Sequence, residues 1–166
     1  LGHEVGPTGV VDAADLHASK MREIGARSRT FVVDWSKGRG EVPVDYDRVL
    51  VDAPCSGTGT LRRRPEIVQR RTPEDVARLA ELQLAILRQA AACVRTGGRL
   101  VYAVCSVLRE EAEAVVEAAI AQGAADGARL EPLAFDAPAV RALFGETTAF
   151  RLLPHVHGTD GYFAAS

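Results

Sequence analysis

Residues 47–59 read DRVLVDAPCSGTG, an apolar β-branched run that ends abruptly in an acid, a proline and a thiol. The run at 49–51 predicts a strand buried on both faces, as in parallel sheets. Pro54 cannot donate to a strand ladder, so the strand should end before it. A carboxylate and a sulfur therefore leave the carboxyl end of a strand together, at the edge where open α/β sheets bind ligands.

Composition and charge exclude several classes of protein. The chain has 166 residues, 47% hydrophobic and 25% charged, as expected for one soluble globular domain. A net charge of −2 leaves no global nucleic-acid signature, so any contact with RNA or DNA must be local. No apolar run approaches the ~20 residues that cross a bilayer, and the start does not resemble a signal peptide. A membrane partner is therefore not expected.

Three cysteines, Cys55, Cys93 and Cys105, form an odd set without CxxC spacing. This pattern argues against a disulfide framework and against a zinc knuckle, so no metal is expected. It favours the reducing cytoplasm as the compartment.

Apolar periodicity predicts strands that alternate with helices. The first half of the chain suggests strands at 9–15, 30–34 and 47–52, each ending on an aspartate, with a short helix at 16–24 stopped by Gly25. A helix should begin at Thr72-Pro73 and run to Gly97-Gly98. A strand is also predicted at 99–104 and a helix at 109–122. Weaker signals indicate a strand near Leu130, a short helix near Val140 and a further element at 150–153, and a terminal strand is predicted at 161–165. This alternation predicts a doubly wound α/β sheet.

Two of the cysteines are candidates for chemistry. Cys55 and Cys105 follow two predicted parallel strands and should emerge at the same sheet edge. A thiolate is a strong nucleophile, and an ordinary thiol pKa of ~8.5 needs only modest lowering near neutral pH. The ordinary alternative, a small buried apolar residue, is preferred for Cys93 in the middle of the predicted helix.

Several acidic and basic residues could either bind a ligand or have an ordinary structural role. Asp15 suits the place of a ribose-binding acid and Asp34 that of an acid facing an adenine, although strand-end acids also cap turns. Five arginines form the only local basic patch, which either neutralises phosphates or is solvated charge: Arg62, Arg63, Arg64, Arg70 and Arg71. His155 and His157 lack partners at metal spacing, which favours a surface or capping role.

Four segments closely resemble the motifs of Sun/Fmu-type (NOL/NOP/Sun) RNA cytosine-5 methyltransferases. They are residues 52–63 (DAPCSGTGTLRR), 70–75 (RRTPED), 97–106 (GGRLVYAVCS) and 157–163 (HGTDGYF). The resemblance covers nearly the whole chain. The two cysteine motifs together are specific, whereas a lone DAPC would not be.

The resemblance implies a Rossmann-like, S-adenosylmethionine-dependent enzyme that methylates carbon 5 of a cytidine in RNA, with rRNA favoured over tRNA. By position, Cys105 would add to carbon 6 of the base, and Asp52 would hydrogen-bond the base near N3. Cys55 would assist removal of the C5 proton and release of the product. The base must be unpaired or flipped to reach the thiolate.

The resemblance also assigns the cofactor and RNA contacts. Asp15 matches the ribose-binding acid, Lys20 a nearby basic contact and Asp34 the adenine-side acid, while Asp52 and Pro54 border the cofactor. The five arginines of the basic patch would bind RNA.

Departures from the family concern two residues and the start of the chain. Val104 stands where the family usually has threonine, and Ala112 where it often has asparagine. The family's glycine-rich loop, its strand and an RNA-binding region are expected upstream of Leu1. Residues 1–166 are thus expected to be the C-terminal part of a catalytic domain, inactive alone, with a short interval between Asp15 and Asp34.

Two other functions remain open on the sequence. One is a non-catalytic RNA-binding or assembly module that keeps the methyltransferase fold. The other is an unrelated thiol enzyme on a doubly wound sheet, against which the paired cysteine motifs argue.

Overall fold

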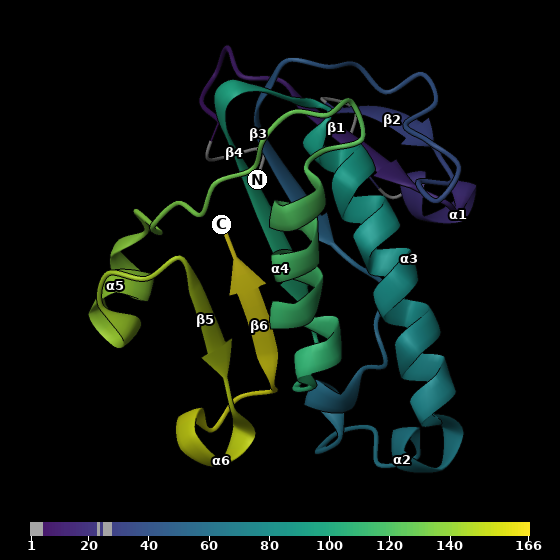
Figure 1. Cartoon of the computed structure of the whole chain (residues 1–166), viewed down its shortest axis with the longest axis vertical. Coiled ribbons are helices and arrows are strands. Elements are labelled where there is room, and N and C mark those ends of the chain that lie inside the picture. The colour runs from purple at the N-terminus through teal and green to yellow at the C-terminus, as the bar shows by residue number, and fades with distance from the viewer. Residues whose placement is uncertain (1–4, 23, 25–27) are drawn as a thin grey trace. The chain divides into compact units, whose positions relative to one another are not determined.

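The computed structural model describes residues 5–22, 24 and 28–166 (Figure 1). The chain divides into two compact units, Leu1–Pro43 and Val44–Ser166.

The first unit is a parallel strand pair. β1 (Val11–Asp15) runs beside β2 (Ser28–Val32), and between them lies the single turn of α1 (Ala18–Met21). The predicted helix at 16–24 is therefore too long, and its predicted stop at Gly25 falls outside the described residues. The predicted strand at 30–34 ends at Val32 instead, because Asp34 accepts hydrogen bonds from both the N–H and the hydroxyl of Ser36 and so forms a turn.

The second unit is a mixed four-stranded sheet in the order β3-β4-β6-β5. β3 (Tyr46–Asp52) and β4 (Val94–Val104) are parallel, whereas β6 (Tyr162–Ala165) is antiparallel to both β4 and β5 (Ala149–Leu152). The long helices α3 (Pro73–Ala91) and α4 (Glu113–Gln122) lie side by side over one face of this sheet (Figure 1). The predicted α/β class with parallel strands is confirmed.

The core of this unit lies between the sheet and the two helices. Tyr102 and Phe163 point from the sheet into it and are about 2% exposed. The prediction that β3 is buried on both faces is wrong, since Leu50, on the other face from Val51, is 52% exposed. In this unit α3 and α4 lie over one face of the sheet, so only the helix-facing side of β3 is covered by them (Figure 1).

Helix α3 begins as the sequence predicts. Thr72 and Asp75 form a reciprocal capping box around Pro73. Its predicted end at Gly97-Gly98 is wrong, because α3 stops at Ala91 and the chain enters β4 at Val94. There Val94 pairs with Tyr46, and the register then shifts before the regular β3–β4 ladder begins. The helical spacing of Val94 thus coincides with the start of a strand.

The remaining elements are short. A 3₁₀ turn, Arg109–Glu111, precedes α4 because Ala112 (φ −115°, ψ −102°) breaks the predicted helix at 109–122. The strand predicted near Leu130 is absent from the described structure, whereas α5 (Pro138–Phe144) and β6 confirm the predicted helix near Val140 and the terminal strand. The weak element expected at 150–153, whose type the sequence left open, is strand β5. The other elements connect these parts: a 3₁₀ turn at Thr58–Thr60, α2 (Ile67–Arg70) and α6 (Pro154–His157).

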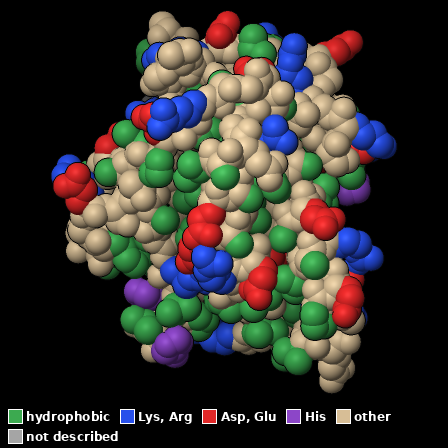
Figure 2. Space-filling model, in the orientation of Figure 1, with side chains coloured by type: hydrophobic (Ala, Val, Ile, Leu, Met, Phe, Trp, Pro, Cys, Tyr) green, Lys and Arg blue, Asp and Glu red, His purple; other side chains and the backbone are tan. Residues whose placement is uncertain are grey.

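On the face that carries α3 and α4, charged side chains of both signs are mixed (Figure 2). Figure 2 shows hydrophobic side chains interspersed with charges of both signs on the face that carries α3 and α4. In the described part of the chain, every helix is too short or too polar to cross a lipid bilayer.

Candidate active site

Two thiols meet at the carboxyl ends of β3 and β4. The Sγ atoms of Cys55 and Cys105 lie 3.1 Å apart, and both cysteines are free. The strands that deliver them are parallel and adjacent, so the shared sheet edge anticipated from the sequence is present.

The two thiols differ sharply in acidity. A hydrogen bond from the Cys55 thiol lowers the pKa of Cys105 to about 7, against the opposing effects of burial and the nearby Asp52 carboxylate. The same hydrogen bond, with burial, raises the pKa of Cys55 far above its ordinary value. At pH 7 about half of Cys105 is therefore thiolate, while Cys55 keeps its proton.

The segment that follows β3 keeps Asp52 and Pro54 next to this pair. Asp52 is the last residue of β3 and is exposed, and the Ala53 N–H continues the ladder to the Ala103 carbonyl at 3.0 Å. The Pro54 carbonyl accepts a hydrogen bond from Gln83 of α3 at 2.8 Å. The backbone around the first thiol is thus tied to both β4 and α3.

A close backbone crossing joins three distant segments beside Cys105. The Gly59 N–H donates to the Cys105 carbonyl at 3.0 Å, and the Gly161 N–H donates to the Gly59 carbonyl at 2.7 Å. A Cβ on Gly59 would lie 2.0 Å from the Gly161 carbonyl oxygen. Only glycine allows this approach.

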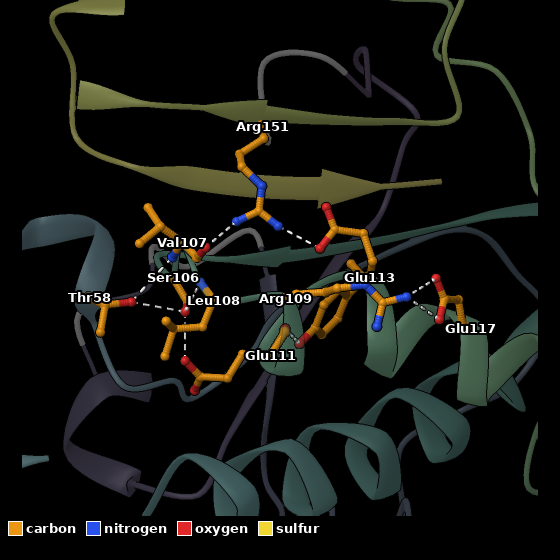
Figure 3. A network of polar contacts seen from close by, with 10 residues as sticks. Thr58, Ser106, Val107, Leu108, Arg109, Glu111, Glu113, Glu117 and Arg151 are labelled. Atoms are coloured by element: carbon orange, nitrogen blue, oxygen red, sulfur yellow. Dashed lines mark hydrogen bonds and ion pairs between the residues drawn. The ribbon is translucent and has the colours of Figure 1, made fainter. Parts of the chain in front are cut away.

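A buried carboxylate that sequence reasoning missed lies behind the thiols. Glu111 is fully buried and accepts from the Ser56 N–H (2.7 Å), the Ser56 hydroxyl (2.5 Å), the Ser106 hydroxyl (2.6 Å) and the Gln83 amide (3.0 Å). Figure 3 shows Glu111 reaching Ser106, whose hydroxyl also contacts Thr58. The repeated dipeptide Cys-Ser at 55–56 and 105–106 was the signal in the sequence that could have suggested a shared partner.

Arg151 of β5 supports the loop after Cys105 from the other side. It donates to the Val107 carbonyl at 2.5 Å and pairs with Glu113 of α4, as Figure 3 shows. Its guanidinium also lies 5.5 Å from the centre of the Phe163 ring.

The basic patch does not act as one group. Arg63 pairs with Asp160, and Arg71 donates to the Ser56 carbonyl at 3.3 Å, so these two stabilise the segments around the thiols. All five arginines are exposed, but within the described structure the side chains of Arg62, Arg64 and Arg70 make no hydrogen bond or ion pair. Beside them lies an apolar groove of about 430 Å³ lined chiefly by Leu61, Ile67, Val68, Val76 and Leu108.

The first unit holds three of the five residues predicted to contact a cofactor: Asp15, Lys20 and Asp34. Asp15, at the end of β1, accepts from the His17 N–H at 2.8 Å and pairs with Lys20 at 3.0 Å. Burial alone would raise the pKa of Asp15, but these two partners together lower it. The pKa of Asp34 is lowered by hydrogen bonds from Ser36 and Lys37, and this carboxylate borders a cavity of about 240 Å³ between Val32 and Gly40.

The remaining candidates have structural roles. Cys93 is 1% exposed in the turn between α3 and β4, which confirms the buried alternative although not its predicted place within a helix. The His157 ring accepts the N–H of Leu153, the residue that precedes α6, which confirms a capping role.

Comparison with known proteins gives one consistent family. A model of the 16S rRNA methyltransferase RsmB/F family matches residues 10–166. The ribosomal RNA small subunit methyltransferase B of Thermus thermophilus is 44% identical over 108 residues, covering 62% of this chain and 27% of that protein. A mouse 28S rRNA (cytosine-C(5))-methyltransferase is 33% identical over 184 residues, covering 95% of this chain and 22% of that protein. The chain thus spans about a quarter of the length of these relatives.

A solved structure extends the likeness to the fold. The crystal structure of NSun6 from Pyrococcus horikoshii with SFG superposes with a TM-score of 0.72 at 28% identity, covering 95% of this chain and 40% of that one.

Proposed function

Because this chain belongs to the 16S rRNA methyltransferase RsmB/F family, we propose that it carries the nucleophile and base-binding groups of an RNA (cytosine-5) methyltransferase. The observation that supports this most is the 3.1 Å separation of the Cys55 and Cys105 sulfurs, a contact through which Cys55 lowers the pKa of Cys105. The proposed substrate is a cytidine in ribosomal RNA.

Cys105 acts as the nucleophile in this proposal. Carbon 5 of an aromatic pyrimidine is a poor nucleophile, so the Cys105 thiolate first adds to carbon 6 and the 5,6 double-bond electrons move to carbon 5 and N3. With its pKa near 7, Cys105 is substantially ionised at neutral pH without a separate general base. The preceding residue is the buried Val104, which offers no hydroxyl beside the nucleophile.

Asp52 and Cys55 act on opposite sides of the same intermediate. Asp52, exposed at the end of β3, hydrogen-bonds the base edge near N3, where charge develops as carbon 6 is attacked. Once Cys105 is bonded to carbon 6, it no longer carries the charge that keeps Cys55 protonated, so Cys55 can lose its proton to solvent. After methyl transfer, the Cys55 thiolate accepts the C5 proton, and the electrons of that C–H bond re-form the 5,6 double bond and expel Cys105 as a thiolate.

S-adenosylmethionine, when bound, supplies the electrophilic methyl group, and the neighbouring NSun6 structure holds its analogue SFG. The first unit fits such a ligand in its donor and acceptor chemistry. Asp15 uses two of its roughly four acceptor positions on His17 and Lys20, so it retains capacity for two ribose hydroxyls. Asp34 beside a cavity bordered by Val32 and Val33 suits the adenine edge.

The RNA contacts in this proposal are local, as the net charge requires. The exposed Arg62, Arg64 and Arg70 neutralise backbone phosphates near the thiol pair. The target cytidine must be unpaired or flipped, since carbon 6 cannot reach a thiolate inside a duplex.

Trapping the covalent intermediate tests the proposal. The full-length Cys55→Ala protein, incubated with cofactor and substrate RNA, should accumulate a protein–RNA adduct that survives denaturing electrophoresis. Cys55→Ala/Cys105→Ala should form none, and Cys93→Ala, a buried thiol away from the pair, should behave like the wild type. An adduct that persists without Cys105 would contradict the assignment of the nucleophile.

Cofactor binding separates the enzyme from a non-catalytic RNA-binding or assembly module. Calorimetry on the full-length protein should show saturable binding of S-adenosylmethionine, weakened by Asp15→Asn. RNA binding with no detectable cofactor binding would instead favour the non-catalytic module.

A further inference from the structure

The buried carboxylate of Glu111 is hydrogen-bonded to several other buried polar residues. Ser56, Gln83, Ser106 and Glu111 are each at most 1% exposed, and among the described residues they are the polar or charged ones that are buried as whole residues. Three of them donate hydrogen bonds to the Glu111 carboxylate. These four residues thus form one buried polar cluster next to the two thiols.

The cluster links the two thiol-bearing loops. Ser56 directly follows Cys55 and Ser106 directly follows Cys105, and both serine hydroxyls donate to the same oxygen, Oε2 of Glu111. Neighbouring Cα atoms are separated by a fixed ~3.8 Å, so fixing each serine also restrains the cysteine before it. The Ser56 N–H, on Oε1, adds a main-chain restraint on the first loop.

A stability role alone does not account for this cluster. Taking a carboxylate out of water opposes folding, and apolar side chains of similar volume would fill the same space without that penalty. What apolar side chains cannot do is hold two loops at a defined separation through directional bonds. The backbone break at Ala112 is what allows Glu111 to leave the solvent-facing path of a regular helix and turn inward.

We infer that Glu111 is a positioning residue of the thiol pair: its buried carboxylate clamps Ser56 to Ser106 and thereby keeps Cys55 and Cys105 in hydrogen-bond contact. The inference deepens the proposed function, on which it rests for the role of Cys105 as nucleophile. It predicts that loosening the clamp separates the sulfurs and returns Cys105 to an ordinary thiol.

The test follows thiol reactivity rather than methylation. Alkylation of Cys105 by iodoacetamide in the full-length protein, read by peptide mass spectrometry across pH, should have its midpoint near pH 7. Glu111→Ala should move that midpoint upward by up to about one pH unit, toward the ordinary thiol value, because losing the Cys55 donor outweighs losing the weaker effect of the Glu111 charge, which raises the Cys105 pKa. Glu111→Gln keeps the length and one acceptor oxygen but removes that charge, so it should leave the midpoint unchanged or lower it slightly.

A matched variant separates positioning from general destabilisation. Tyr102→Phe removes two buried hydrogen bonds from the same scaffold, to the Glu111 carbonyl (2.7 Å) and to Gln83 (3.1 Å), but leaves the carboxylate clamp intact. It should lower the thermal midpoint of unfolding and leave the alkylation midpoint in place. An alkylation midpoint that stays at its wild-type value in Glu111→Ala, or that moves equally in Tyr102→Phe, would overturn the inference.

A second variant covers the possibility that Glu111→Ala does not fold. Ser56→Ala/Ser106→Ala removes both hydroxyl arms of the clamp with little change in volume, and it should raise the alkylation midpoint in the same direction. Because alkylation needs neither RNA nor cofactor, a protein that fails to methylate cytidine would still give a decisive result. Failure of the clamp and failure of the proposed function are therefore distinguishable.

Discussion

Gly59 and Gly161 cross backbone to backbone, with the N–H of Gly161 donating to the carbonyl of Gly59 at 2.7 Å. Neither residue can carry a side chain there, since a Cβ on Gly59 would lie 2.0 Å from the Gly161 oxygen and 2.9 Å from the Cys105 oxygen. Gly59→Ala should therefore displace the Cys105 loop and cost about 1–3 kcal/mol of stability, the usual penalty of overpacking. Urea unfolding and the Cys105 alkylation rate measure the two effects.

Gly127→Ala is the control for that substitution. Gly127 has a left-handed backbone (φ 88°) but open space around its Cα, so alanine there introduces conformational strain without a clash. It should lower stability by about 1 kcal/mol and leave Cys105 reactivity unchanged. Equal alkylation rates in the wild type and in Gly59→Ala would contradict the role assigned to the crossing.

Removing the Cys55 thiol should change the pH dependence of Cys105. The Cys55 S–H stabilises the charged form of Cys105 and so lowers its pKa to about 7; losing that donor raises the pKa. The midpoint of Cys105 alkylation in Cys55→Ala should therefore rise by about one pH unit, with reduced reactivity at pH 7 and equal reactivity above about pH 9. Cys55→Ser restores a donor and should move the midpoint less; a larger shift in serine than in alanine would contradict this explanation.

Arg151 should stabilise the loop after Cys105 because two nitrogens of its planar guanidinium bind two partners at once. One guanidinium nitrogen binds the Val107 carbonyl and another pairs with Glu113, which a single ammonium cannot reproduce. Arg151→Lys and Arg151→Ala should both lose about 1–2 kcal/mol in urea unfolding, since Glu113 is partly exposed. Full rescue by lysine would show that charge alone, without the two nitrogens, is sufficient.

The basic patch should divide into RNA-binding and structural arginines. Arg62→Ala/Arg64→Ala/Arg70→Ala should weaken binding of single-stranded RNA and reduce the slope of log K against log salt by about two, at ~0.7 for each phosphate that is no longer neutralised. The thermal midpoint should not change, because within the described structure these exposed side chains make no hydrogen bond or ion pair. Arg71→Ala, which loses its bond to the Ser56 carbonyl, should instead lower the thermal midpoint.

Local signals in the sequence predicted the elements that carry the thiols. Helix α3 begins at the residue that the capping pattern at Thr72 predicts. Strands β3 and β4 end where the apolar runs before Asp52 and Cys105 predict, and these carboxyl ends carry the thiols. Strand ends in a parallel sheet meet at one edge, so placing Cys55 beside Cys105 needed no more than the alternation of strands and helices. The family resemblance is confirmed over residues 10–166.

The misses come from tertiary contacts that override local patterns. Val94 has helical spacing to Leu87 and Ala90, but pairing with Tyr46 takes it into β4. Glu111 lies in a charged run that is typical of an exposed helix start, yet four donors from three other segments draw it inward. No local pattern records those donors, which lie between 5 and 55 residues away in sequence.

The crossing of Gly161 over Gly59 also determines when, during folding, the site around Cys105 can form. The two glycines are separated by about a hundred residues of sequence, and contacts of such separation form late because loop closure must precede them. Cys105 should therefore stay an ordinary, sluggish thiol while the chain is folding and gain its nucleophilic character only when the sheet is complete. In a newly made chain, the Cys105 thiol would therefore react slowly until the sheet and the site around it have formed.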